Sequence, residues 1–290
     1  MNTKKISSLL VFFGLSLSLL QAQIQSPKSS PTVEIKQTVG LSEIELEYSR
    51  PGVKGRTIFG DLVPYGQVWR MGANHCTVIE FDDAVTFAGK EVKAGTYGLF
   101  AIPNKDEWTI IISNQNDLWG SAGYDESKDV ARVTVKSEKV PNTIETMTID
   151  FNDFKDNGAT LAIMFENTAV KIPVTVDTDA VIEEQIKKNL VDGDGKGLEA
   201  GDYHSAAVFY QKQGKDLDQA LVWMDKSIEM NPTAFYYVYR KAELLKEMGK
   251  KKEAIKTAEK SLEMAKANKD GDFGYVAKNE ALIKELKAKK

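Results

Sequence analysis

Hydrophobic and polar residues alternate one by one in many segments between Thr32 and Val176. Ile44, Leu46 and Tyr48, for example, alternate with glutamates at positions 43, 45 and 47. This period of two buries one face of a β-strand and leaves the other face in water. Ten such runs occur, at residues 33–39, 44–48, 77–81, 84–87, 98–102, 108–113, 131–136, 145–151, 160–166 and 171–176. Short strands separated by turn residues predict an antiparallel, jelly-roll-like β-sandwich over residues 32–177.

The hydrophobic period becomes that of an α-helix after Asp177. Thr178 or Asp179 can cap the first helix, and glycines at positions 193, 195 and 197 end it. The change of period places a domain boundary here. We expect a second, α-helical domain over residues 178–290.

Within this helical domain, two segments repeat at an offset of 34 residues, which is the period of tetratricopeptide repeats. Ala220-Leu221 matches Ala254-Ile255, and the five residues from Lys226 match the five from Lys260. The pattern predicts an array of tetratricopeptide-like helical hairpins. The units are expected at about residues 201–232 and 233–266, followed by a terminal helix at about 272–289.

The first 22 residues are typical of a signal peptide. Lys4 and Lys5 supply positive charge, residues 6–20 form an apolar run, and Ala22 offers a small residue for cleavage. The run is shorter than the roughly 20 residues that a membrane-spanning helix needs. We expect cleavage after Ala22, a flexible N-terminus at residues 23–31, no membrane span, and a periplasmic or secreted location.

The charge of the mature chain argues against a nucleic-acid partner. Residues 23–180 contain 15 basic and 23 acidic side chains, whereas residues 181–290 contain 21 basic and 19 acidic ones. Neither part carries the basic stripe that binds a phosphate backbone. Cys76 is the only cysteine, so the chain forms no internal disulfide despite the oxidising compartment expected for it.

Two connections in the predicted sandwich, residues 49–74 and 114–129, are longer than hairpins, and long ordered loops are often functional. Their arginine and aromatic side chains suit a small polar ligand such as a sugar, a carboxylate or a peptide end. In the internal alternative, Arg70 pairs with Asp61 and Trp69 packs in the core. The candidate binding residues are Arg50, Arg56, Asp61, Tyr65, Trp69, Arg70, Asn74 and Trp119.

The helical domain offers a second candidate site, which would bind a protein partner. Aromatic residues and arginine are enriched at protein interfaces, and aromatic residues cluster at the start of the second repeat. The candidate groove residues are Tyr203, Tyr236, Tyr237 and Arg240.

No metal site and no cofactor are expected. The stretch Asp192–Gly197 begins like a calcium loop, but Lys196 stands at the fifth ligand position and Tyr203 at the twelfth, where a carboxylate belongs. The two histidines, His75 and His204, have no second ligand at helical spacing, and no cysteine pair supports a zinc site.

A long and unusual string, RTIFGDLVPYGQVWRMGAN, runs from Arg56 to Asn74. Two shorter strings accompany it, Gly89-Lys90 leading into residues 94–103 and Asp117-Leu118-Trp119-Gly120. Over about residues 30–176 the chain resembles an exported bacterial family called domain of unknown function 2911. The resemblance implies a β-sandwich that is often followed by helical repeats. It transfers no catalytic residue, because no activity is established for the family.

These observations favour a non-enzymatic envelope protein that acts in binding or as a scaffold. The repeats would bind a protein partner, and the sandwich would bind a ligand or dock on another protein. The alternative is an envelope hydrolase acting on glycan or peptide, with its site in the loop at residues 49–74. No Gly-x-Ser-x-Gly elbow supports that alternative.

Overall fold

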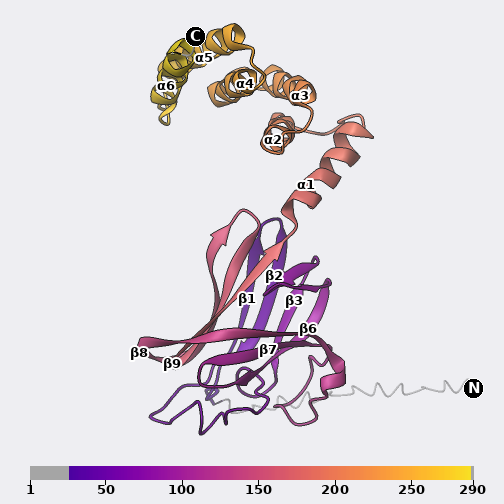
Figure 1. The fold of residues 1–290 in the computed structure, drawn as a ribbon, viewed down its shortest axis with the longest axis vertical. Coiled ribbons are helices and arrows are strands. Elements are labelled where there is room, and N and C mark those ends of the chain that lie inside the picture. Colours follow the sequence, from indigo (N-terminus) through magenta and orange to yellow (C-terminus); the bar gives the residue numbers. More distant parts are fainter. Residues whose placement is uncertain (1–25, 289–290) are drawn as a thin grey trace, which may run out of the picture.

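The computed structural model describes residues 26–288, and the predicted signal peptide lies outside the described residues. Up to Val176 the described chain is a β-structure whose strands all pair antiparallel (Figure 1). Its strands are β1 (Thr32–Val39), β2 (Ser42–Ser49), β3 (Thr77–Phe81), β4 (Val85–Phe87), β5 (Lys90–Val92), β6 (Gly95–Pro103), β7 (Glu107–Ser113), β8 (Asp129–Lys155) and β9 (Gly158–Val176).

One long strand connects the two halves of this sheet, whose order is β1-β2-β3-β6-β7-β8-β9-β4-β5. Residues 129–136 of β8 pair with β7, and the rest of β8 pairs with β9. The two halves face each other across the core. One direct contact between them is the hydrogen bond that the hydroxyl of Tyr48 on β2 donates to the carbonyl of Ile149 on β8, at 3.0 Å. The prediction of an antiparallel sandwich is confirmed.

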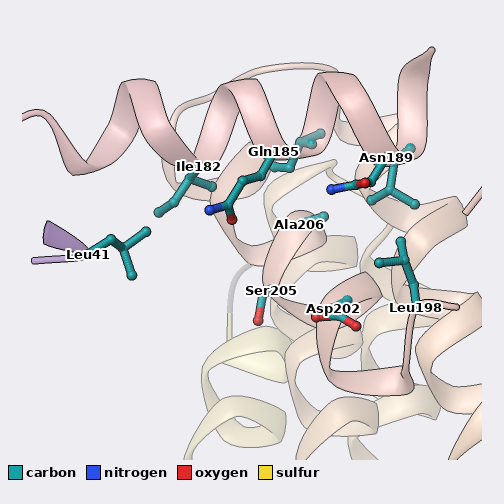
Figure 2. Close-up of a pocket in the computed structure, with 10 residues that line it drawn as sticks. Leu41, Ile182, Gln185, Asn189, Leu198, Asp202, Ser205 and Ala206 are labelled. Atoms are coloured by element: carbon teal, nitrogen blue, oxygen red, sulfur yellow. The ribbon is translucent and has the colours of Figure 1, made fainter. Parts of the chain in front are cut away.

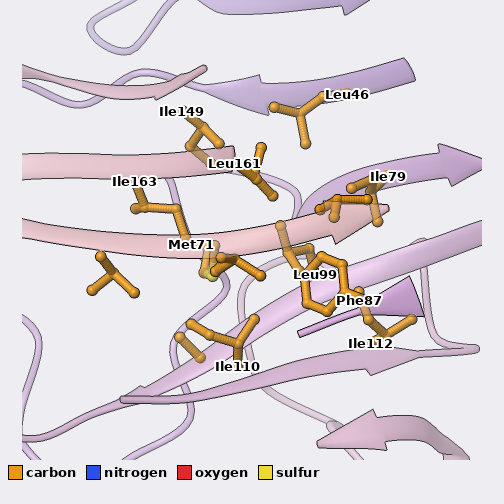
Figure 3. Packing of buried hydrophobic residues seen from close by; sticks show 14 of the residues in the cluster. Leu46, Met71, Ile79, Phe87, Leu99, Ile110, Ile112, Ile149, Leu161 and Ile163 are labelled. Atoms are coloured by element: carbon orange, nitrogen blue, oxygen red, sulfur yellow. The ribbon is translucent and has the colours of Figure 1, made fainter. Parts of the chain in front are cut away.

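The core lies between the two halves, as the alternating pattern predicts. On β2, the side chains of Ile44, Leu46 and Tyr48 are buried, while the glutamates between them point outward. Figure 3 shows how side chains from both halves meet, with Leu46 and Ile79 opposite Ile149 and Leu161. The loop between β2 and β3 adds to this core, since its Met71 is fully buried.

The expectation of ten separate strands is wrong in three places. The runs at 131–136 and 145–151 both belong to β8, and those at 160–166 and 171–176 both belong to β9. Register shifts in the β8–β9 ladder break the alternation of side chains without ending either strand. β5 pairs with β4 at residues where none of the ten predicted runs lies.

The described chain is helical beyond Asp177, and the predicted helical fold is confirmed. Asp177 is itself the first cap, since its carboxylate accepts from the amide of Ala180 at 3.0 Å; the expected caps Thr178 and Asp179 lie inside the helix. A π-helical turn (Lys187–Val191) continues α1. The helices are α1 (Thr178–Ile186), α2 (Ala200–Lys212), α3 (Leu217–Met230), α4 (Phe235–Glu247), α5 (Lys251–Ala267) and α6 (Tyr275–Ala288).

Small residues let the later helices pack closely in sequential pairs. Ala207 and Ala220 are fully buried where α2 meets α3, and Ala242 and Ala254 are fully buried where α4 meets α5. Such contacts explain why alanine recurs at the repeat offset. Within residues 26–288, no helix is both long and apolar enough to cross a membrane.

Candidate functional site

Trp69, the central aromatic residue of the predicted ligand site, belongs to the core. Only 7% of its surface is exposed, and its ring meets the edges of Phe59 at 5.7 Å and Trp108 at 5.9 Å between centroids. Its backbone forms two hydrogen bonds with Ala101 of β6, at 2.7 and 2.9 Å. Because the ring is buried, Trp69 offers no face to a ligand and is removed from the candidate site.

Two of the candidate arginines hold the loop in place through backbone carbonyls. Arg50 donates from Nε to the carbonyl of Met147 at 3.0 Å and from Nη2 to the hydroxyl of Thr148 at 2.9 Å. Arg56 donates from Nε to the carbonyl of Val53 at 2.9 Å and from Nη2 to that of Gly52. These guanidinium groups are already occupied, so neither presents a free fork of donors.

Asp61 and Tyr65 are exposed and stand apart from the other candidates. The Tyr65 ring lies over Gly60, where a Cβ atom would stand 2.7 Å from the ring. The internal alternative for Arg70 also does not hold, since within the described residues no ion pair joins it to Asp61. The tip of the loop therefore adds nothing to a site around Arg70.

Arg70, Asn74 and Trp119 are brought together, because the two long loops meet here. Two backbone hydrogen bonds join the loops. The amide of Gly120 donates to the carbonyl of Asn74, and the amide of Cys76 donates to the carbonyl of Leu118, each at 2.9 Å. We call this contact the Arg70–Trp119 site, which consists of Arg70, Asn74, His75, Trp119 and Gly120.

A second, smaller hydrophobic cluster fixes the two loops on the outer face of the sheet. Its buried members are Cys76, Phe100 and Ile111, and Leu118 and Tyr124 of the second loop pack against them. The ring centroids of Phe100 and Tyr124 lie 5.4 Å apart. The Arg70–Trp119 site is formed by loops, but this hydrophobic cluster packs beneath it and holds the loops in position.

The side chains of this site combine a half-buried cation that lacks a partner with an exposed ring. Nε of Arg70 is buried without a hydrogen-bond partner among the described residues, and this burial lowers the pKa of its guanidinium. The Trp119 side chain is 66% exposed. His75 meets the Trp119 ring at right angles, with centroids 4.7 Å apart. Sequence reasoning gave His75 no role, although its position next to Asn74 was a usable signal.

The candidate partner residues on α4 have different environments. Tyr237 is buried, and its ring stacks on His204 of α2 at 4.5 Å between centroids. Burial first, and then the charge of Arg240, lower the pKa of His204. Arg240 is exposed and pairs with Glu243 at 2.7 Å, and Tyr236 is 37% exposed. Tyr237 is therefore part of the packing between repeats, whereas Tyr236 and Arg240 are available at the surface.

Tyr203 lies on another surface from the α4 residues. Its hydroxyl donates to the carbonyl of Gly195 at 3.4 Å. It lines a groove of about 550 Å³ together with Val222, Trp223 and Lys226. The four candidate partner residues therefore do not share one groove.

Sequence reasoning missed an aromatic groove at the far end of the array. This groove, which we call the Phe273 groove, has a volume of about 430 Å³. Its exposed aromatic residues are Phe273, which is 71% exposed, and Tyr236, with Tyr275 beside them. The usable signal was the string Gly271-Asp-Phe-Gly-Tyr275, in which two glycines flank an apolar ring.

A further cavity of about 350 Å³ lies where the helices join the sandwich. Figure 2 shows Ile182 and Gln185 of α1 facing Ala206 and Ser205 of α2, with Leu41 of the β1–β2 turn at one side. The Lys212 ammonium also pairs with Asp156 of the β8–β9 turn at 3.0 Å. No group of three or more His, Cys, Asp or Glu residues that could hold a metal ion occurs in the described part of the chain.

The fold and these surfaces define a β-domain of the sandwich type followed by paired helices of the tetratricopeptide type. Comparison with known families agrees. The family described as "Protein of unknown function (DUF2911)" matches residues 30–174, so the chain belongs to this family and the resemblance seen in the sequence is confirmed. A tetratricopeptide repeat matches residues 236–268.

Comparison with individual proteins gives less information about this chain than comparison with families. No curated protein matches the chain. Among solved structures, the crystal structure of PcrH from Pseudomonas aeruginosa is similar, with 16% identity and a TM-score of 0.32. The similarity covers 39% of this chain and 78% of PcrH.

Proposed function

We propose that this chain is an exported envelope protein whose helical repeats bind a protein partner and whose β-domain binds a small polar ligand or docks on another protein. The signal-peptide pattern of residues 1–22 supports the export and a periplasmic or secreted location. The tetratricopeptide match supports a protein partner. The role is one of binding rather than of chemistry.

The observation that carries the proposal is the exposure of aromatic rings in the Phe273 groove. An aromatic ring in water costs free energy, and a protein tends to expose one where a partner will cover it. Phe273 and Tyr236 come from different parts of the repeat domain but line the same groove. Tyr275 is held beside them by edge contacts with Phe235 at 5.4 Å and Tyr239 at 5.3 Å.

Site-specific photo-crosslinking in cells tests this proposal. A photoreactive phenylalanine analogue replaces Tyr236 or Phe273 in the full-length chain, and we expect both positions to give an adduct with the same protein. Val130 on β8, an exposed apolar residue of the β-domain, is the matched control position and should give no such adduct.

Val222 on α3 distinguishes the two grooves of the helical domain, because it is exposed and lies beside Tyr203. An adduct at Val222 but not at Tyr236 or Phe273 would contradict the proposal by placing the partner on the other surface. Adducts at none of the helical positions would contradict a partner role for the repeats altogether.

The hydrolase alternative would need a nucleophile or an acid–base pair in the loop at residues 49–74. The arginine side chains that hold this loop, Arg50 and Arg56, bond to backbone carbonyls and a hydroxyl, as a structural role requires. No observation in the described loop singles out a reacting group, so we propose binding rather than hydrolysis.

A further inference from the structure

Arg70 differs from every other arginine of the chain. The sequence contains five arginines, and all lie in the part that the structure describes. Arg50 and Arg56 bond to other parts of the backbone, while Arg132 pairs with Glu126 and Arg240 with Glu243. Among the five, only the Arg70 side chain has no hydrogen bond or ion pair within residues 26–288, and its Nε is buried. A guanidinium is rarely left in this state unless something else pairs with it.

Gly120 lies next to the end of this guanidinium. Gly120 adopts a φ of +82°, a conformation that favours glycine, and a Cβ atom there would stand 3.7 Å from Nη1 of Arg70. Any longer side chain at this position would extend next to the charge. The absence of a side chain at Gly120, the residue after Trp119, therefore leaves the space next to Nη1 open.

Trp119, the residue before Gly120, supplies an exposed apolar surface in the same contact between the two loops. Its ring is mostly exposed, yet the right-angle contact with His75 and the backbone bonds of its neighbours hold it in place. An exposed ring that is held in the same loop contact as an unpaired cation is a pre-organised arrangement for a ligand that has one apolar face and one negative group.

The Arg70 guanidinium favours a carboxylate, and the Trp119 ring favours a ligand that contains a small ring. A guanidinium donates two parallel hydrogen bonds to a carboxylate, and an indole face packs against the C–H face of a sugar ring. The net negative charge of residues 23–180 disfavours polyanions such as nucleic acids. We infer that the Arg70–Trp119 site binds a monoanionic sugar acid of the uronate type, with its carboxylate on Arg70 and its ring against Trp119. This inference rests on the ligand-binding role proposed for the β-domain.

Tryptophan quenching by acrylamide gives a direct test in the full-length protein. Trp119 is the only exposed tryptophan of the four, because Trp69, Trp108 and Trp223 are at most 7% exposed. Quenching therefore reports on Trp119. Glucuronate should protect Trp119 in a saturable manner, and the neutral sugar glucose should not.

Variants then assign the two contacts by calorimetric titration with glucuronate. Arg70→Lys keeps the charge but loses the fork, and Trp119→Ala loses the ring, so each should weaken binding at least about tenfold. Arg56→Lys is the matched control, because its guanidinium is already occupied by backbone carbonyls. It should leave the affinity unchanged.

Several outcomes would overturn the inference. They are the absence of protection by glucuronate, equal affinity in the Arg70→Lys variant, or protection by inorganic phosphate without protection by glucuronate. The crosslinks at Tyr236 and Phe273 test the protein-partner role independently of the titration. A failed titration with intact crosslinks would remove the ligand site alone, and lost crosslinks with an intact titration would remove the partner alone.

Discussion

Replacement of Trp69 by alanine should strongly destabilise the β-domain, whereas the same replacement of Trp119 should not. The two residues have the same chemistry and lie in the two long loops, but Trp69 is 7% exposed and Trp119 is 66% exposed. The pair therefore isolates the effect of burial on the free energy of unfolding.

The magnitude follows from the buried surface of Trp69. A buried tryptophan removes about 150–250 Å² from water. At about 25 cal/mol per Å² this contributes about 4–6 kcal/mol. Alanine retains part of this burial, and the unfolded chain already buries some of it. Edge contacts with Phe59 and Trp108 add about 0.5–1.5 kcal/mol each. The expected loss is about 3–5 kcal/mol, which is usual for tryptophan-to-alanine changes in cores.

Urea unfolding followed by far-UV circular dichroism measures this loss, since tryptophan fluorescence would itself be changed by the substitutions. At about 2–4 °C per kcal/mol, Trp69→Ala should also lower Tm by about 6–20 °C. Trp119→Ala should stay within about 0.5 kcal/mol of the parent protein. Equal unfolding midpoints for the two variants, or a loss below about 1 kcal/mol for Trp69→Ala, would refute the assignment of Trp69 to the core.

Three further outcomes are expected. The exported protein should begin at Gln23, and an intact mass that retains the first 22 residues would contradict export by cleavage. Calcium titration should leave Tm unchanged, because Lys196 puts a positive charge among the would-be ligands; a saturable rise in Tm would show the opposite. Burial raises the pKa of Tyr48 above its ordinary 10.0. Its contribution to stability is therefore complete below pH 10 and declines as the pH rises through the folded-state value; Tyr48→Phe should make alkaline unfolding less steep.

The fold could be predicted from the sequence wherever one local period persisted. The alternation at Ile44, Leu46 and Tyr48 depends only on which face of a strand is buried, and the helical fold depends on small residues recurring at the repeat offset. The length of β8 could not be predicted in the same way. Its pairing changes from β7 to β9 between Lys136 and Ser137, and shifts in the β9 ladder then break the alternation. A single strand with two partners and a broken period is indistinguishable from two strands in the sequence alone.

Which of the candidate residues form the Arg70–Trp119 site could not be predicted, because this is set by long-range contacts that no local sequence pattern encodes. Arg50, Arg56 and Arg70 are alike in the sequence, yet Arg50 is occupied by the carbonyl of Met147, which is 97 positions away in the chain. Arg56 is occupied by its own loop, three and four residues back.

Whether an arginine is available to a ligand is thus decided by which carbonyls the fold brings within reach of it. The same holds for the rings, since Trp69 is buried against Phe59 and Trp108 and pairs with Ala101 of β6, whereas Trp119 stays exposed where the two loops meet. A loop rich in arginine and tryptophan predicts a recognition surface somewhere along it. The unsatisfied donor of Arg70 identifies where on the loop this surface lies.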